Sequence, residues 1–268
     1  AGRRVRLIEP DTTQLRRGLD RIAADLGRAG DKGDLTPEQQ AEVLSRIEPT
    51  PDLGVVGTPR LVIEAVYENL DTKLEVFRTL DELCPSETVL ASNTSSISIT
   101  ALGAATRRPD RVVGMHFFNP VPLMKLVEVV RGLDTGESTI ALVLEEARLL
   151  GKTPVVVSDM PGFVSNRLLI PMINEAVFAL QEGVASAEEI DTVMRLGMNH
   201  PMGPLRLADL IGLDVCLQIL NVLQGGFGDP KYRPCPLLRQ MVAAGRLGRK
   251  TGQGFYTYET EDQPRARG

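Results

Sequence analysis

Short apolar runs alternate with helical patterns over the first 158 residues of the chain. Most of these runs are continuously apolar rather than alternating, as is typical of strands in a sheet that is covered on both faces. They predict strands at Val5–Ile8, Leu61–Val66, Thr88–Ala91, Arg111–Phe118, Leu126–Val130 and Thr153–Val157. Because helical patterns separate the runs, we expect an α/β fold with a doubly wound, mostly parallel sheet.

Three helices are expected between the early strands. The first carries an apolar stripe made of Leu15, Leu19, Ile22 and Leu26. The second begins at Thr36-Pro37-Glu38-Gln39, which provides an N-cap threonine, an N1 proline and a capping-box glutamine. The third runs from Asn69 to Leu83, and we expect its inward residues to be Leu70, Leu74, Phe77 and Leu80. This placement leaves Lys73 on an exposed-looking helix face.

The pattern changes after Ser158, where helical periodicity replaces the strands. Helices are predicted at Phe163–Glu182, Ala187–Leu196, Asp214–Leu223 and Pro236–Ala244. We therefore expect a nucleotide-binding α/β domain over residues 1–159 and an all-α C-terminal domain over residues 160–268. The cleft between two such domains is the expected ligand site.

Composition narrows the function classes. The 268 residues are 43% apolar, which is enough for two domains, and the net charge of −5 without a basic block argues against nucleic acid as a partner. No apolar run approaches membrane-spanning length. The three cysteines, Cys84, Cys216 and Cys235, are far apart and form no CxxC pair. We expect reduced thiols of a cytoplasmic protein, and no metal site.

The segment from Thr88 to Val130 carries the candidate chemistry. If the strands around the turn NPVPLM pair antiparallel, with the turn centred near Pro122, then His116 faces Glu128. An imidazole with a carboxylate behind it is a general base held in one tautomer. The hydroxyl and amide run Ser92–Ser96 follows the preceding strand, where open α/β sheets place ligands. This arrangement suits proton chemistry on an alcohol or a carbonyl.

The first strand, Val5–Ile8, is typical of the second strand of a Rossmann-like dinucleotide-binding unit, with Glu9 at its carboxyl end. An acid there accepts hydrogen bonds from ribose hydroxyls and repels a 2′-phosphate, which favours NAD over NADP. The sequence contains no GxGxxG motif. We expect the strand and glycine loop that would precede Val5 to be missing from this sequence, and NAD binding by the 268 residues alone to be weak.

Six sequence blocks, taken together, resemble a known family. They are IEAVYEN, ASNTSSISIT, GMHFFNPVPLMKLVEVV, DMPGFVSNRLL, NHPMGP and GRKTGQGFY. In this order they resemble the L-3-hydroxyacyl-CoA dehydrogenases, including the bacterial 3-hydroxybutyryl-CoA enzymes. The resemblance implies an NAD-dependent oxidoreductase that interconverts (S)-3-hydroxyacyl-CoA and 3-oxoacyl-CoA in fatty acid or butanoate metabolism. It also implies a homodimer formed through the helical domain.

The resemblance assigns roles to individual positions. The catalytic positions it implies are Ser95, His116, Glu128 and Asn166. The positions that resemble NAD contacts are Glu68, Lys73, Ser95, Asn119 and Lys250, in addition to Glu9 from its place on the strand. Those that resemble contacts with the acyl-CoA substrate are Lys73, Ser95 and Asn166.

Plainer interpretations remain open for several of these residues. His116 could be a packed core histidine, and Glu128 could pair with Lys125 or Arg131. Lys73 could be a solvated charge, and Lys250 could belong to a basic surface cluster. The whole chain could be a gulonate or hydroxy-acid dehydrogenase relative, or a non-catalytic structural module derived from a truncated dehydrogenase.

Overall fold

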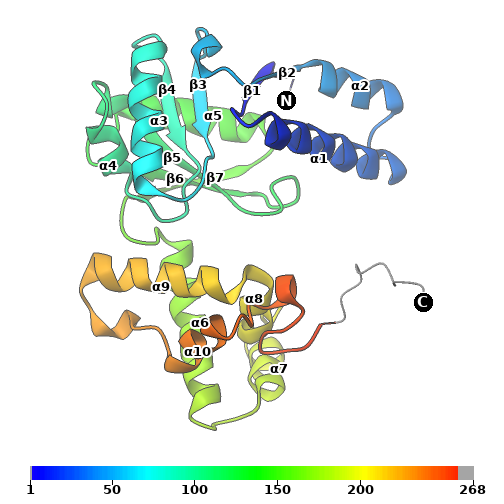
Figure 1. Ribbon diagram of the computed structural model, residues 1–268, viewed down its shortest axis with the longest axis vertical. Helices are drawn as coiled ribbons and strands as arrows, with labels where there is room; N and C mark the ends of the chain where they lie inside the picture. Colours follow the sequence, from blue (N-terminus) through cyan, green and yellow to red (C-terminus); the bar gives the residue numbers. More distant parts are fainter. Residues whose placement is uncertain (1, 259–268) are drawn as a thin grey trace. The chain divides into compact units, whose positions relative to one another are not determined.

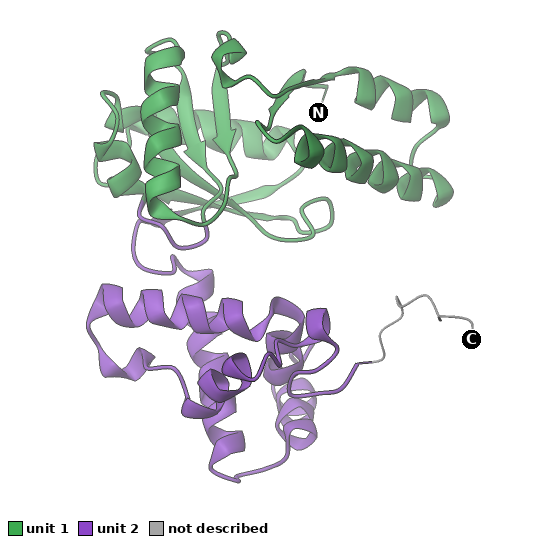
Figure 2. Cartoon of the chain, in the orientation of Figure 1, with its two compact units in different colours: residues 1–94, 99–156 green, residues 95–98, 157–268 purple. Residues whose placement is uncertain are grey.

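The structure, a computed structural model, describes residues 2–258. Its contacts divide the chain into two units, coloured separately in Figure 2. Unit 1 contains residues 1–94 and 99–156, and unit 2 contains residues 95–98 and 157–268. Unit 1 is α/β and unit 2 is helical, so the predicted fold class is confirmed.

The strands of unit 1 form two sheets (Figure 1). In the smaller sheet, β1 (Val5–Ile8) pairs in parallel with β2 (Ile47–Thr50). The larger sheet has the order β3 (Leu61–Glu64), β4 (Val89–Ser92), β5 (Val112–Phe117), β6 (Leu126–Arg131) and β7 (Thr153–Ser158). Strands β3, β4 and β5 are parallel, and β6 is antiparallel to β5. The carboxyl ends of β3, β4 and β5 therefore meet at one edge.

Helices cover both faces of the larger sheet. Helix α5 (Glu137–Leu149) packs on the face that carries Met115, with which it shares a hydrophobic core. Helix α4 (Ile99–Ala104) lies on the opposite face, where Ile99 approaches Gly114 so closely that a Cβ added there would be 3.1 Å from Ile99 Cδ1. Because side chains alternate along a strand, His116 shares this second face with Gly114.

Helices α1 (Thr12–Asp31) and α2 (Pro37–Ser45) lie side by side in unit 1 (Figure 1). The predicted capping box of α2 is present: Thr36 Oγ1 accepts from the Gln39 amide, and Gln39 Oε1 accepts from the Thr36 amide. Strand β2, which follows α2, was not predicted. Its sequence IEPT has a single apolar side chain and a proline, so it carries no strand pattern.

Helix α3 (Leu70–Leu83) buries a different face from the one we predicted. Phe77 and Leu80 are buried as expected, but Leu70 is 44% exposed and Lys73 is 1% exposed. Lys73 lies four residues before Phe77 and seven before Leu80, so the three share one side of the helix. The interpretation of Lys73 as an exposed charge was wrong.

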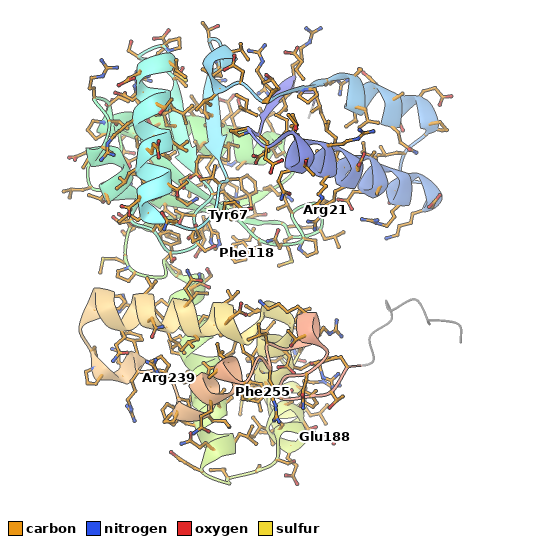
Figure 3. The ribbon with its side chains drawn as sticks, in the orientation of Figure 1. Arg21, Tyr67, Phe118, Glu188, Arg239 and Phe255 are labelled. Atoms are coloured by element: carbon orange, nitrogen blue, oxygen red, sulfur yellow. The ribbon has the colours of Figure 1, made fainter. Side chains whose placement is uncertain are left out.

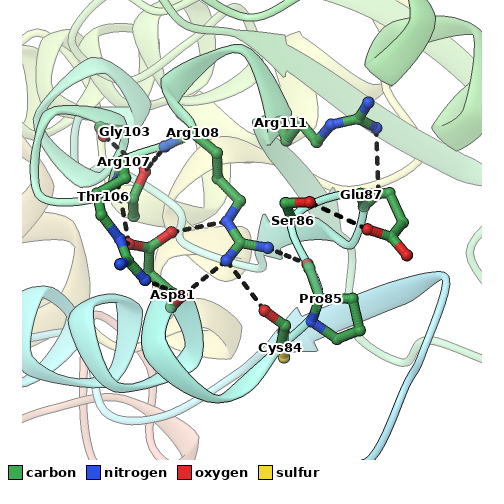
Figure 4. Close-up of polar contacts among 10 residues, drawn as sticks. All are labelled: Asp81, Cys84, Pro85, Ser86, Glu87, Gly103, Thr106, Arg107, Arg108 and Arg111. Atoms are coloured by element: carbon green, nitrogen blue, oxygen red, sulfur yellow. Dashed lines mark hydrogen bonds and ion pairs between the residues drawn. The ribbon is translucent and has the colours of Figure 1, made fainter.

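The C-terminal end of α3 is closed by two arginines (Figure 4). Arg108 Nη2 donates to the carbonyls of Asp81 and Cys84, at 2.6 and 3.0 Å, and so satisfies acceptors that a helix end leaves unpaired. The Asp81 carboxylate accepts from Arg108 Nε at 2.6 Å and from Arg107 Nε at 2.7 Å. The buried pair of Asp81 and Arg108, joined by the exposed Arg107, therefore caps the end of α3.

Unit 2 packs its helices around α6. The helices are α6 (Ser165–Gln181), α7 (Ala187–Gly197), α8 (Pro204–Ile211), α9 (Leu213–Phe227) and α10 (Pro236–Ala243). Their shared core includes Ile173, Leu205, Leu220 and Leu238. Helix α8 was not predicted, because its N-cap, Gly203, has no side chain. The carboxylate of Asp191, on α7, caps α8 instead, accepting from the amides of Leu205 and Arg206 at 2.8 and 2.9 Å.

The segment that follows α10 is held by buried carboxylates. Asp209 accepts from the amides of Phe255 and Tyr256, at 2.9 and 3.0 Å, and from the Tyr258 hydroxyl at 3.0 Å. Tyr256 also donates its hydroxyl to Asp191 at 2.7 Å. The end of the block GRKTGQGFY is therefore hydrogen-bonded to carboxylates of α7 and α8 within unit 2.

Within residues 2–258, no single helix is both long and apolar enough to cross a bilayer. Helices α8 and α9 reach that length only together, and they are bent by 98° at their junction. Most of their apolar residues belong to the core of unit 2, whereas Leu210 and Val215 are exposed.

We expect Asp81→Asn to destabilise the protein by about 3 kcal/mol near pH 7, because it leaves the buried Arg108 without its carboxylate. Burial alone raises the pKa of Asp81, but the hydrogen bonds from Arg107 and Arg108 prevail and hold this pKa below its ordinary value. The stabilisation is therefore full above the unfolded-state pKa and is lost as the pH falls through the folded-state value. Urea unfolding of the wild type and of Asp81→Asn, at pH 7 and near pH 3, measures how their free energies of unfolding differ at each pH.

Glu137→Gln is the control, because it breaks an ion pair with Arg131 in which the Glu137 side chain is 85% exposed. Its free energy of unfolding should stay close to that of the wild type. If the free energies of unfolding of the wild type and Asp81→Asn differ by the same amount at both pH values, the ion pairs of Asp81 do not account for the stability of the cluster.

Candidate active site

The His116–Glu128 pair has the register that the sequence predicted. Strands β5 and β6 place the two residues opposite each other, and His116 Nδ1 lies 2.8 Å from Glu128 Oε2. Both side chains are buried. A carboxylate only accepts, so Nδ1 carries the ring proton in this bond and Nε2 carries the lone pair of the neutral ring. The alternative pairings of Glu128 with Lys125 or Arg131 are not observed.

Neighbouring groups hold the imidazole in place. The ring of Phe118 lies 4.6 Å from the His116 ring, centroid to centroid, at an interplanar angle of 46°. Asn93 Oδ1 accepts from the Phe117 amide at 2.9 Å, which continues the β4–β5 pairing beyond the last backbone partners, Ser92 and Gly114. Figure 3 shows Phe118 and Tyr67 at the same edge of unit 1, where β5 and β3 end.

A second buried acid, Glu64, ends strand β3 and was not among the predicted site residues. Its carboxylate accepts from Lys73 Nζ at 2.7 Å, from Ser92 Oγ at 2.6 Å and from the Val66 amide at 2.6 Å. An acid that closes an apolar strand, LVIE, is the sequence signal that could have identified it.

Two predicted cofactor residues, Lys73 and Glu68, meet beside this acid. Lys73 Nζ lies 3.5 Å from Glu68 Oε2 and donates to the Val66 carbonyl at 3.2 Å. Thr94 Oγ1 donates to Glu68 Oε1 at 2.6 Å. Lys73 is therefore enclosed by protein acceptors, whereas Glu68 is partly exposed.

Ser95 and Asn166, both assigned to unit 2, are directly bonded. Asn166 Nδ2 donates to the Ser95 carbonyl at 3.1 Å. Ser98 Oγ donates to Asp159 at 2.7 Å, so the segment Ser95–Ser98 is attached to unit 2 at two points. Asn166 lies in the first turn of α6, as predicted.

The remaining predicted residues occupy separate places. Glu9 follows β1 and is half-buried, and its Oε1 accepts from the Asp11 amide at 3.0 Å. Asn119 is exposed. It follows Phe118, the first residue after β5. Lys250, in unit 2, pairs with Asp214 near the start of α9, with Nζ 2.6 and 2.7 Å from its two carboxylate oxygens. Lys250 therefore forms an ion pair and is not only a member of a basic surface cluster.

This geometry supports proton transfer. A buried imidazole with a fixed tautomer can accept a proton from a hydroxyl and return it to a carbonyl, while the carboxylate behind it stabilises the positive ring. Among the described residues, no group of three or more His, Cys, Asp or Glu side chains could hold a metal ion.

Two family models cover almost the whole chain. Residues 1–160 match the model for the NAD binding domain of 3-hydroxyacyl-CoA dehydrogenase. Residues 162–258 match the model for the C-terminal domain of 3-hydroxyacyl-CoA dehydrogenase.

Individual relatives agree with these models. The chain is 55% identical to a probable 3-hydroxybutyryl-CoA dehydrogenase of Bacillus subtilis, over 97% of this chain and 90% of the relative. It is 56% identical to a 3-hydroxybutyryl-CoA dehydrogenase of Clostridioides difficile, over 85% of this chain and 81% of the relative. The crystal structure of (S)-3-hydroxybutyryl-CoA dehydrogenase PaaH1 from Ralstonia eutropha is similar at a TM-score of 0.93 and 49% identity, covering 96% of this chain and 90% of that one.

Proposed function

The chain belongs to the 3-hydroxyacyl-CoA dehydrogenase family, and on that premise we propose that it interconverts (S)-3-hydroxyacyl-CoA and 3-oxoacyl-CoA with NAD. The observation that carries this proposal is the buried 2.8 Å contact between His116 and Glu128. Similarity to two 3-hydroxybutyryl-CoA dehydrogenases favours short acyl chains as substrates, in fatty acid or butanoate metabolism. The three buried, unpaired cysteines are consistent with a cytoplasmic enzyme.

The residues present fit NAD. Glu9 follows the parallel strand β1, where a carboxylate accepts hydrogen bonds from ribose hydroxyls and repels a 2′-phosphate. We assign Glu68, Asn119 and Lys250 to the cofactor as further contacts, and Lys73 to the same side of the site. The ratio of kcat/KM for NADH to that for NADPH in the full-length protein tests the role of Glu9, and we expect it to be well above one. A ratio near one would show that Glu9 does not contact the ribose.

In the oxidation direction, His116 Nε2 accepts the proton of the 3-hydroxyl group. When bound, NAD supplies the hydride acceptor. Glu128 keeps Nδ1 protonated and stabilises the imidazolium that forms. In the reduction direction, the same imidazolium returns the proton to the carbonyl oxygen.

Two polar residues complete the proposed substrate contacts. Ser95 donates its hydroxyl to the reacting oxygen, and Asn166 donates its amide to the thioester carbonyl. The hydrogen bond from Asn166 to the Ser95 backbone carbonyl supports this assignment, because it holds the Asn166 amide beside Ser95 before substrate binds. Burial of Lys73 disfavours a direct contact with the pantetheine of CoA.

Replacing His116 by Gln should lower kcat by ~10²–10⁴, the usual contribution of general acid–base catalysis, and leave NADH affinity nearly unchanged. Glu128→Gln should also lower kcat, because an amide does not stabilise an imidazolium. The measurement is NADH-coupled reduction of acetoacetyl-CoA by the full-length protein, together with an NADH fluorescence titration of the same protein.

The matched control is His200→Gln, which changes the second of the two histidines. It should retain the wild-type rate. A His116→Gln enzyme with more than about half of the wild-type kcat would remove His116 from the proposed mechanism.

We also propose a homodimer formed through unit 2. We predicted this from the apolar circumference of the helix now seen as α6, but its inner side is covered within the unit, where Ile170, Ile173 and Val177 are fully buried by neighbouring helices. Exposed apolar side chains of unit 2 include Val164, which precedes α6, Leu168 on α6, and Val184, Val193, Leu196 and Met198 on and around α7. Leu168 is 68% exposed and Leu196 is 77% exposed. We place these side chains in the proposed interface because large exposed apolar patches mark protein interaction sites.

Light scattering at micromolar concentration should give the mass of two chains. Leu196→Asp should lower the measured mass toward one chain, because it would place a charge in the interface. Leu133→Asp is the control: Leu133 is 82% exposed but belongs to unit 1, so this variant should remain dimeric. A monomeric wild-type mass that persists on concentrating would contradict the dimer.

A further inference from the structure

The turn between β5 and β6 is the most exposed part of the segment that carries the proposed chemistry. It joins the strand of His116 to the strand of Glu128, and residues 119–125 are all exposed. Leu123, near the middle of the turn, is 73% exposed. Burial of apolar side chains therefore does not order this turn, and its conformation depends on hydrogen bonds.

Hydrogen bonds attach the turn to the segment that begins β7. Lys152 Nζ donates to the carbonyls of Val121 and Met124, the second at 2.8 Å. The Thr153 amide donates to the Lys125 carbonyl at 2.7 Å. A single ammonium group therefore bridges two carbonyls that lie three residues apart on the turn.

The backbone of Lys152 is itself fixed by the end of α5. The Lys152 amide donates to the Ala147 carbonyl at 3.0 Å, and the Gly151 amide donates to the Arg148 carbonyl at 2.9 Å. With Gly151 at a φ of 72°, these two bonds form a Schellman motif. Ala147 is fully buried in the core that α5 shares with the sheet. Lys152 therefore extends from a rigid base toward an exposed turn.

The position of Asn119 gives this contact a role beyond folding. Asn119 is the first residue of the exposed turn, and the proposed function assigns it to the cofactor. Fixing a long lysine side chain costs rotamer entropy, and this cost is met when the protein folds. If the turn is ordered in advance, the binding of NAD does not have to order it, and Asn119 is already in place.

We propose that Lys152 is a positioning residue for NAD, which it serves by fixing the β5–β6 turn and so presenting Asn119 to the cofactor. The inference rests on the proposed function, since that function makes Asn119 a cofactor contact. It extends the site to a residue that the sequence did not single out.

Replacing Lys152 by Met in the full-length protein tests the proposal. The variant keeps an unbranched side chain and loses both hydrogen bonds to the turn, so the NADH dissociation constant should rise by about tenfold, the lower end of what a hydrogen bond from a charged group contributes. Lys152→Arg keeps a cation with N–H donors and should stay within about threefold of the wild type. An NADH fluorescence titration measures these constants, and wild-type affinity in Lys152→Met would overturn the proposal.

The matched control is Lys231→Met, which makes the same change at an exposed lysine of unit 2 that pairs with Asp229. Its NADH affinity should equal that of the wild type. An equal loss of affinity in Lys231→Met and Lys152→Met would trace the effect to the lost charge and would contradict the role of the turn.

A double-mutant cycle with Asn119→Ala shows whether Lys152 acts through Asn119. If it does, Lys152→Met should change the NADH dissociation constant by less than about twofold in the Asn119→Ala protein. Effects of the two substitutions that multiply in full would show that Lys152 acts independently of Asn119, and so would sink the proposal. An Asn119→Ala protein with wild-type affinity would sink it too, because there would be no contact to position.

A general loss of structure would affect the substrate as well as the cofactor. In Lys152→Met, KM for acetoacetyl-CoA at saturating NADH should stay within about twofold of the wild type, because Asn119 is assigned to the cofactor. An equal rise of this KM and of the NADH dissociation constant would argue against a positioning role.

Hydrogen exchange of the wild type decides the question if Lys152→Met does not fold. The amides of Leu123 and Met124 both donate to the Pro120 carbonyl at 3.0 Å. Without NADH, they should exchange at least about tenfold more slowly than in a peptide of the same sequence, because the turn is ordered in advance. Exchange at the peptide rate until NADH is added would overturn the proposal. A wild-type protein that binds no NADH would instead contradict the proposed function itself.

Discussion

The contact between His116 and Glu128 is the interaction on which the proposed chemistry depends. A buried carboxylate without a partner is costly, so Glu128 requires a donor, and the β5–β6 register supplies His116 as that donor. The same bond that satisfies the carboxylate selects the tautomer of the ring. Strand pairing, the burial of Glu128 and the placement of the ring lone pair on Nε2 are therefore consequences of one arrangement.

Buried acids are paired in the same way in several other places. Glu64 joins the loops at the carboxyl edge of the sheet, Asp81 holds the end of α3, and Asp191 and Asp209 attach the last described segment to unit 2. Each accepts from at least one group distant in sequence, so each fixes a place where the chain folds back on itself. One of the six family sequence blocks, GRKTGQGFY, takes part in such contacts through Phe255 and Tyr256.

Features with a local or periodic cause were predictable from the sequence. The His116–Glu128 register followed from the position of a short turn, and the capping box of α2 followed from Thr36 and Gln39. The family and the α/β fold followed by all-α helices were also predicted correctly. What failed depended on long-range partners. Glu64 and Lys73 are buried only because each neutralises the other across nine residues, and α8 is capped by a carboxylate from α7. The spacing of apolar positions in the sequence does not reveal either arrangement.

The tautomer of His116 tests the central claim most directly. Nitrogen-15 NMR of the histidine rings, recorded at a pH of about 9 where an ordinary imidazole is neutral, distinguishes a protonated Nδ1 from a protonated Nε2. The account predicts that the neutral His116 ring carries its proton on Nδ1 and that Glu128→Gln lowers the fraction of molecules in this form. A wild-type ring protonated on Nε2 would contradict it, because Nε2 would then have no lone pair with which to accept the substrate proton.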